Sequence, residues 1–197
     1  MESTPGRPSL AYSALGQCAR EGESVITRLM TDKLANPQML SLAAGFTDNR
    51  VLPQELVWET MEALGRGEDR GHLQYGMNRG RPGLRTAVTD LLRSYPGEQE
   101  LDLSPDDVLV TNGSQQGLYI LVQMLCDPGD IVLVESPSYF VFLELLAGLG
   151  VKAVSLPMDA AGGLDENRLP GFFDDLLASG DLERVRLIYI MGAFANP

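Results

Sequence analysis

The second half of the sequence repeats one pattern, in which a short apolar run is followed by a turn and then by a longer amphipathic stretch. The runs "IVLV", "VKAVSLP" and "VRLIYIM" are apolar at consecutive positions rather than at alternate ones. Such runs are typical of strands that are buried on both faces. Strands that alternate with helices pair in parallel. The sequence therefore predicts an α/β fold, with three α/β/α layers around a mostly parallel sheet.

The same periodicities place the individual elements along the chain. Helices are predicted at 24–35, 53–67, after the loop around Tyr75, and at 114–126, 138–150 and 169–180. Strands are predicted at 40–43, 107–111, 131–136, 151–157 and 185–191.

Charge and composition exclude several classes of function. The formal net charge of −12 argues against a nucleic-acid surface and against attraction to anionic membranes. With one histidine and two distant cysteines, the chain lacks the ligand spacing of a metal site. No apolar run is long enough to span a bilayer, and the first residues lack a signal-peptide core. We therefore expect a cytoplasmic protein with no metal, no nucleic-acid partner and no membrane partner.

The stretch "VLVTNGSQQGLYIL", residues 108–121, places a glycine turn and a helix start directly after an apolar run. This arrangement has two interpretations. Ser114 is either an ordinary N-cap, or part of a site in which the N–H groups of the new helix bind an anion.

Four segments decide between these interpretations by their order: "LSLAAGFTDNRVLP", "LQYGMNRGRPGLR", "VLVTNGSQQGLYIL" and "GDIVLVESPSYF". A fifth, "IYIMGAFANP", fits more weakly. In this order the chain resembles the amino-terminal half of a class I/II aminotransferase, a pyridoxal-phosphate enzyme of fold type I, closest to the aminoadipate/kynurenine and valine types. The resemblance implies an N-terminal arm and small-domain segment over 1–45, and over 46–197 the first part of the cofactor-binding large domain, incomplete at its C-terminus.

The resemblance also implies a cofactor site. Ser114 and Gln115 would bind the phosphate of pyridoxal 5'-phosphate, and the ring of Tyr139 would stack on its pyridine face. Asn196 would contact the cofactor's 3-hydroxyl oxygen, although Gly192 stands where the family usually has proline. The alternatives are that Tyr139 is a core residue at a helix start and that Asn196 is an ordinary turn residue before proline.

Two further residues are implied to act across the dimer and on the substrate. Tyr75 would reach the phosphate of the neighbouring subunit, which predicts a homodimer, and the backbone at Gly45 would approach the substrate carboxylate. The alternatives are a locally packed tyrosine and a turn glycine. The cluster of Arg79, Arg81 and Arg85 has no implied role, and Arg81 and Arg85 fit a solvated helix face.

Transamination by this family also needs a lysine that holds the cofactor covalently and moves a proton. The chain has two lysines, Lys33 and Lys152, and neither stands in the family's Ser-x-x-Lys setting. The sequence thus predicts a fragment of an aminotransferase that acts on an unidentified amino acid and 2-oxo acid and is inactive alone, with no catalytic residue of its own.

The alternatives are a non-catalytic binding or dimerisation module, and a lyase or decarboxylase of the same fold. A transcription regulator with a winged helix is disfavoured, because the short segment before the match lacks a basic helix-turn-helix.

Overall fold

The computed structural model describes residues 12–13, 16–17, 25–36, 38–40, 47–68, 70–97 and 101–192. The polypeptide forms two compact units. The sheet unit comprises Met1–Gly22 and Asn112–Pro197, and the helical unit comprises Glu23–Thr111.

A three-stranded parallel sheet lies at the centre of the sheet unit. Its strands are β1 (Ile131–Val134), β2 (Lys152–Ser155) and β3 (Val185–Tyr189), in the order β2-β1-β3. Every side chain of β1 is buried, whereas β2 and β3, the outer strands of the sheet among the described residues, keep exposed positions. The predicted parallel sheet is confirmed, but full burial is limited to the central strand.

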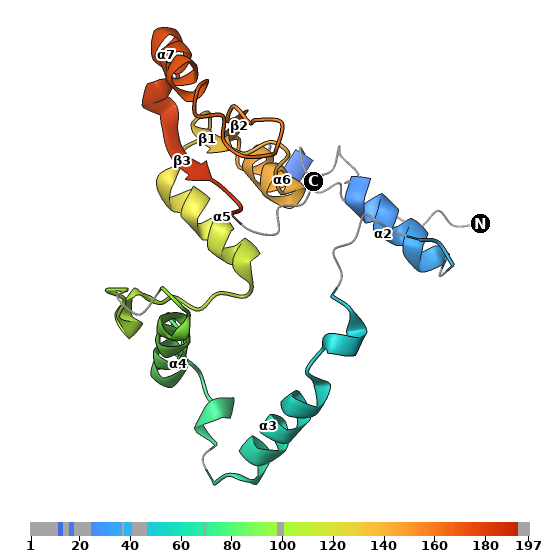
Figure 1. Ribbon diagram of the computed structural model, residues 1–197. Helices are drawn as coiled ribbons and strands as arrows, with labels where there is room; N and C mark the ends of the chain where they lie inside the picture. Colours follow the sequence, from blue (N-terminus) through green and yellow to red (C-terminus); the bar gives the residue numbers. More distant parts are fainter. Residues whose placement is uncertain are drawn as a thin grey trace, which may run out of the picture. The chain divides into compact units, whose positions relative to one another are not determined.

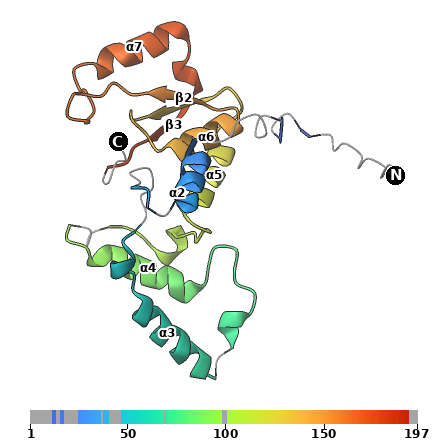
Figure 2. The same ribbon diagram turned by 90° about the vertical axis from the view of Figure 1, so that its right-hand side faces the viewer.

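Helices cover both faces of this sheet, which gives the three predicted layers. Alternate residues of β1 point to opposite faces. Val132 and Val134 contact a cluster with α5 (Ser114–Leu125) and α6 (Phe140–Gly148). Ile131 and Leu133 contact the other cluster, which contains α7 (Leu169–Ser179). Figures 1 and 2 show α7 on one side of the strands and α5 and α6 on the other.

The helical unit contains α2 (Val25–Ala35), α3 (Gln54–Arg66) and α4 (Pro82–Ser94). Short 3-10 turns lie at η1 (Asn49–Val51), η2 (Gly71–Leu73) and η3 (Pro105–Asp107), and a fourth, η4 (Leu182–Arg184), precedes β3 in the sheet unit. These helices agree with the predicted ones within a few residues at each end.

Arg85 is buried in the helical unit, so its prediction as part of a solvated helix face was wrong. Its Nη1 donates to the Pro105 carbonyl oxygen at 2.7 Å and to Asp106 Oδ1 at 3.0 Å. The residue is 8% exposed, and Thr89 Oγ1 donates to its carbonyl oxygen. Arg85 therefore fastens α4 to η3.

The predicted strand at 107–111 is also wrong. Among the described residues, no strand pairs with this segment, although Val110 N donates to the Arg79 carbonyl oxygen at 3.0 Å. An apolar run becomes a strand only where another strand accepts and donates its backbone hydrogen bonds. Of the strand predicted at 40–43, Leu40 is not in a strand and the rest lies outside the described residues.

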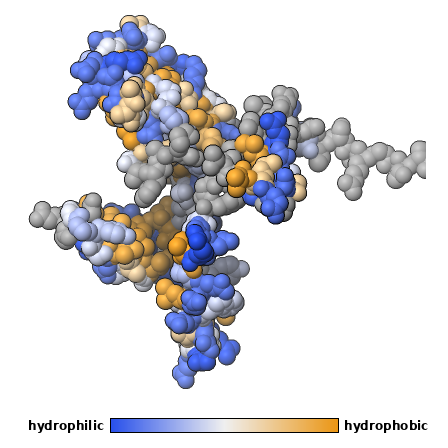
Figure 3. Space-filling view, turned by 45° about the vertical axis from the view of Figure 1, so that its right-hand side comes forward, coloured by the Kyte–Doolittle hydropathy of each residue, from blue (hydrophilic) through white to orange (hydrophobic). Residues whose placement is uncertain are grey.

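Apolar side chains are exposed on both units, and Figure 3 shows hydrophobic surface interspersed with hydrophilic surface. Within the described ranges, no helix combines the length and apolar character needed to cross a membrane.

Candidate functional site

The site begins at the turn that leads into α5. Gly113 has φ 82° and ψ 164°, a conformation that glycine adopts readily because it has no Cβ. Before it, Asn112 N donates to Gln116 Oε1 at 2.6 Å, which fixes the turn against the first turn of the helix.

Gly113 is the N-cap, so Ser114 is the first helical residue rather than the cap itself. No side chain from the described residues caps this terminus. The first N–H groups of an α-helix have no partner within the helix, and they carry the positive end of its dipole. The start of α5 therefore presents backbone donors and a positive potential, which favour a negatively charged group.

Tyr139 lies beside this helix start, although it is distant in sequence. It is half-buried at the residue before α6, packed against the core cluster of α5 and α6. Gln115 Nε2 donates to Tyr139 Oη at 2.8 Å. The structure therefore brings together Ser114–Gln115 and Tyr139. Sequence analysis missed the bond that joins them.

Two more polar groups lie after β1, and sequence analysis missed both. Glu135 is 7% exposed, and its Oε1 accepts a hydrogen bond from Met191 N at 3.0 Å, which ties the end of β1 to the segment after β3. Burial, and then the nearby Glu135 carboxylate, raise the pKa of Tyr189. Ser138 Oγ is buried with no hydrogen-bond partner among the described residues. The sequence signal that could have indicated these groups is Glu135, a glutamate directly after the apolar run of β1.

Of the other predicted site residues, Tyr75 alone is among those that the structure describes. Tyr75 belongs to the helical unit, where it is fully exposed after η2. The guanidinium of Arg81 donates to the carbonyl oxygens of Gly71 and Gln74 and so holds the loop that precedes Tyr75. Gly45 and Asn196 lie outside the described residues.

The two lysines belong to different units. Lys152 is the first residue of β2, paired in register with Ile131, and so stands at the edge opposite to the carboxyl ends of the strands. Lys33 lies in α2 of the helical unit, where its Nζ donates to the Met39 carbonyl oxygen at 2.5 Å.

The residues present fit a phosphate ester on a planar ring. The uncapped start of α5 supplies backbone donors and the Ser114 hydroxyl for the phosphate, and the glycine before it keeps the approach open, since no atom lies within 4 Å of an added Cβ. Tyr139, joined to the same turn, supplies an aromatic ring close by.

Comparison with known proteins identifies the family of the chain. Residues 37–177 match the family described as "Aminotransferase class I and II", which is more than half of the chain. Aromatic-amino-acid aminotransferase 1 of Thermococcus litoralis is 28% identical over 96% of this chain and 44% of its own length. The probable rhizopine catabolism regulatory protein of Rhizobium meliloti is 27% identical over 80% of this chain and 29% of its own.

Among solved structures, the kynurenine aminotransferase of Pyrococcus horikoshii superposes with a TM-score of 0.77 and 26% identity. The match covers 94% of this chain and 44% of that one. The chain therefore spans less than half of the length of each of these relatives.

Proposed function

Because the chain belongs to the class I and II aminotransferase family, we propose that it binds pyridoxal 5'-phosphate and forms part of an enzyme that transfers an amino group from an amino acid to a 2-oxo acid. The observation that carries the cofactor assignment is the hydrogen bond between Gln115 and Tyr139, which joins an open helix start to an aromatic ring.

In this proposal the start of α5 holds the cofactor phosphate. The backbone N–H groups of Ser114 and Gln115 and the Ser114 hydroxyl donate to its oxygens, and the positive end of the helix dipole favours its charge. Gly113 leaves the approach open, because a side chain at this φ would be strained and would stand beside the anion.

Tyr139 would lie against the pyridine ring and fix its plane. Its hydrogen bond to Gln115 and its packing against the core of α5 and α6 hold the phenol ring in one orientation. When bound, the cofactor supplies the electron sink that weakens bonds at the Cα of an amino acid. The residues of this chain bind and orient it.

We assign no covalent role to either lysine. Lys152 stands at the amino end of β2, and Lys33 is bonded within the helical unit. The covalent lysine of the family is therefore not attributed to this chain.

The proposal includes a homodimer. Tyr75 is fully exposed, yet its loop is held by Arg81, which is the state that suits a residue reaching into a neighbouring subunit. Its target there would be the cofactor phosphate.

Binding of two ligands to the full chain tests the cofactor proposal: pyridoxal 5'-phosphate, and pyridoxal, which lacks the phosphate. Ser114→Asp places a carboxylate against the phosphate, so we expect affinity for the phosphorylated ligand to fall about tenfold or more, equivalent to about 1.4 kcal/mol. Affinity for pyridoxal should stay within about twofold. Calorimetric titration measures both. An equal loss for both ligands, or no loss for either, would contradict a phosphate site at α5.

Two variants at Tyr139 separate the ring from its hydroxyl. Tyr139→Phe keeps the stacking face and should bind the cofactor nearly as well as the native chain, whereas Tyr139→Leu should bind it several-fold more weakly. Borohydride reduction and peptide mapping then test the lysines. A covalent cofactor adduct on Lys33 or on Lys152 would refute the proposal that neither lysine binds the cofactor covalently.

A further inference from the structure

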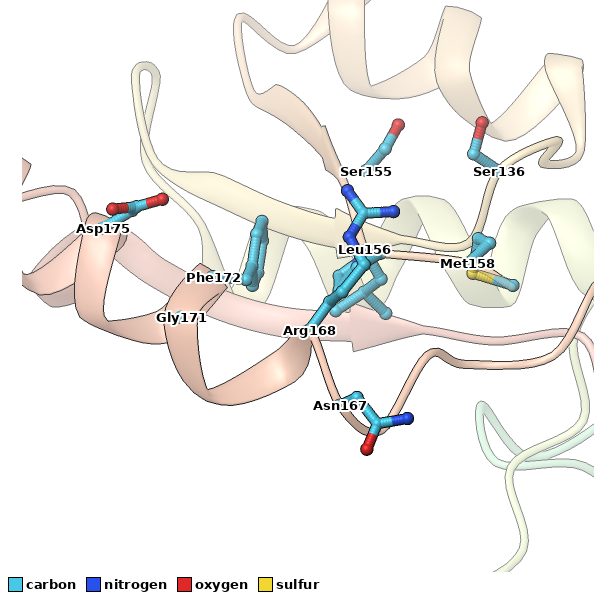
Figure 4. A pocket seen from close by; sticks show the side chains of 10 residues that line it. Ser136, Ser155, Leu156, Met158, Asn167, Arg168, Gly171, Phe172 and Asp175 are labelled. Atoms are coloured by element: carbon cyan, nitrogen blue, oxygen red, sulfur yellow. The ribbon is translucent and has the colours of Figure 1, made fainter. Parts of the chain in front are cut away.

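A pocket of about 650 Å³ lies at the carboxyl ends of β1 and β2, and it is lined by neither Ser114 nor Tyr139. Ser136 follows β1, and Ser155 ends β2. The opposite wall is the start of α7, from which Arg168, Phe172 and Asp175 line the pocket (Figure 4). The volume is in the range that holds a small organic ligand.

The position of this pocket follows from the chain's path through the sheet. After β1 the chain turns to α6 on one face, and after β2 it turns to α7 on the other face. The two loops therefore diverge at the carboxyl edge between neighbouring strands. In open α/β sheets, such a divergence leaves the crevice in which ligands bind.

One side of α7 lines the pocket with a basic, an aromatic and an acidic side chain. Arg168, Gly171, Phe172 and Asp175 follow the i, i+3, i+4, i+7 spacing that aligns residues along one helix face. In Figure 4 the Arg168 side chain extends from the start of α7 toward the end of β2. The described residues offer neither its guanidinium nor the Asp175 carboxylate a hydrogen bond or an ion pair.

Apolar side chains line the pocket beside these charges, together with the polar residues Ser136, Ser155 and Asn167. Leu156 is 4% exposed and belongs to the core cluster on this face, and Met158 and Phe172 are packed against that cluster. Gly171 adds room, since no atom lies within 4 Å of a Cβ built on it. A guanidinium beside an apolar floor suits a carboxylate with a hydrophobic body, because the planar fork of arginine matches the two oxygens of a carboxylate.

We propose that this pocket binds a monocarboxylate with an aromatic or comparable apolar body, paired through its carboxylate with Arg168 and packed on Phe172 and Met158. Asp175 disfavours a second negative charge on the ligand, which makes the site selective against dicarboxylates. Neighbouring side chains four residues apart on a helix stand about 5–6 Å apart at Cβ, a separation that suits a carboxylate and a ring joined by a short linker. The proposal does not rest on cofactor binding.

Calorimetric titration of the full chain with 3-phenylpropanoate tests this site. We expect saturable binding that weakens about tenfold or more in Arg168→Gln, because a charge-assisted pair is lost. Arg184→Gln is the matched control, since Arg184 lies in η4, immediately before β3 at the amino edge of the sheet. It should change affinity by less than about twofold.

Two more comparisons make the test independent of that one arginine. Gly171→Leu fills the open room without changing charge and favours the helix, so it should abolish binding while the chain stays folded by circular dichroism. Phenylsuccinate, a dicarboxylate, should bind the native chain about tenfold more weakly than 3-phenylpropanoate, and Asp175→Asn should remove most of that difference.

Several results would overturn the proposal. These are the absence of saturable binding, equal losses in Arg168→Gln and Arg184→Gln, or unchanged binding in Gly171→Leu. Competition by pyridoxal 5'-phosphate, together with a loss in Ser114→Asp, would instead place the carboxylate at α5. Failure of the cofactor proposal leaves the Arg168 result unaffected, so the two outcomes are distinguishable.

Discussion

Strand β1 and helix α3 both carry apolar side chains, but these side chains are buried in β1 and exposed in α3. All four side chains of β1 are buried, whereas no residue of α3 is. The apolar face predicted for α3, formed by Val57, Met61 and Leu64, stays between 50% and 56% exposed. The difference lies in the surroundings: β1 has a strand on each side and a helical layer on each face, and the residues described in the helical unit provide α3 with no comparable surface.

This contrast indicates which of the two units contributes more to the stability of the chain. Burial of apolar area is the main favourable contribution to folding, and an amphipathic pattern supplies it only where a second apolar surface lies against it. We therefore infer that the sheet unit carries most of the packing energy. In the helical unit, order depends more on single polar contacts such as those of Arg85.

The largest effect on stability is expected when two side-chain truncations are compared, one in β1 and one in α3. Leu133→Ala removes a fully buried side chain from the centre of the sheet and should lower the free energy of unfolding by about 2–5 kcal/mol. Met61→Ala, on the exposed face of α3, should change it by about 0.5 kcal/mol or less. Urea denaturation followed by circular dichroism measures both. Equal losses would show that α3 is buried in solution and would break the comparison.

A smaller effect is expected from the polar fastening of the helical unit. Arg85→Met keeps the length of the side chain but loses its bonds to Pro105 and Asp106, so local stability around α4 should fall by about 1–3 kcal/mol. Hydrogen exchange of the α4 amides measures this loss.

The control for that variant is Arg66→Met, which breaks an exposed pair with Glu62 and should cost about 0.5 kcal/mol or less. If both variants left the exchange of α4 unchanged, the buried contacts of Arg85 would not hold the unit together.

The smallest effect is a pH dependence confined to the sheet unit. The Asp127 backbone N–H, and then Arg186, hold the pKa of Asp130 below the ordinary value of 3.8. Because the folded pKa is lowered, the stabilisation is present above 3.8 and is lost as the pH falls through the folded value. In Asp130→Asn, the free energy of unfolding should therefore fall less steeply as the pH is lowered below about 4. An equally steep fall in both proteins, measured by urea titrations at several pH values, would contradict this assignment.

The fold was largely predictable from local pattern, with exceptions that share one cause. The runs at 107–111 and 131–134 look alike in sequence, yet only the second forms a strand, because it has partners on both sides. Likewise Arg85 reads as a surface charge until η3 brings a carbonyl oxygen and a carboxylate to it from twenty residues away.

For the site, sequence resemblance named Ser114, Gln115 and Tyr139, and their roles remain predictions. The bond between Gln115 and Tyr139 had no local signal, because it depends on how α5 and α6 pack on the same face of the sheet. The Arg168 pocket was missed for a related reason. The helix spacing of Arg168, Phe172 and Asp175 was visible, but the walls supplied by the ends of β1 and β2 were not.

The sequence by itself determined the helices, the parallel strands 131–134, 152–155 and 185–189, and the glycine turn before α5. Hydrophobic period and backbone dihedral preference act over a few neighbouring residues, and so they can be recognised locally. Tertiary structure alone decided which apolar runs became strands, which charges were buried, and which polar groups meet at the carboxyl edge of the sheet. These outcomes depend on contacts between segments far apart in the chain, and such contacts leave no periodic trace in either segment alone.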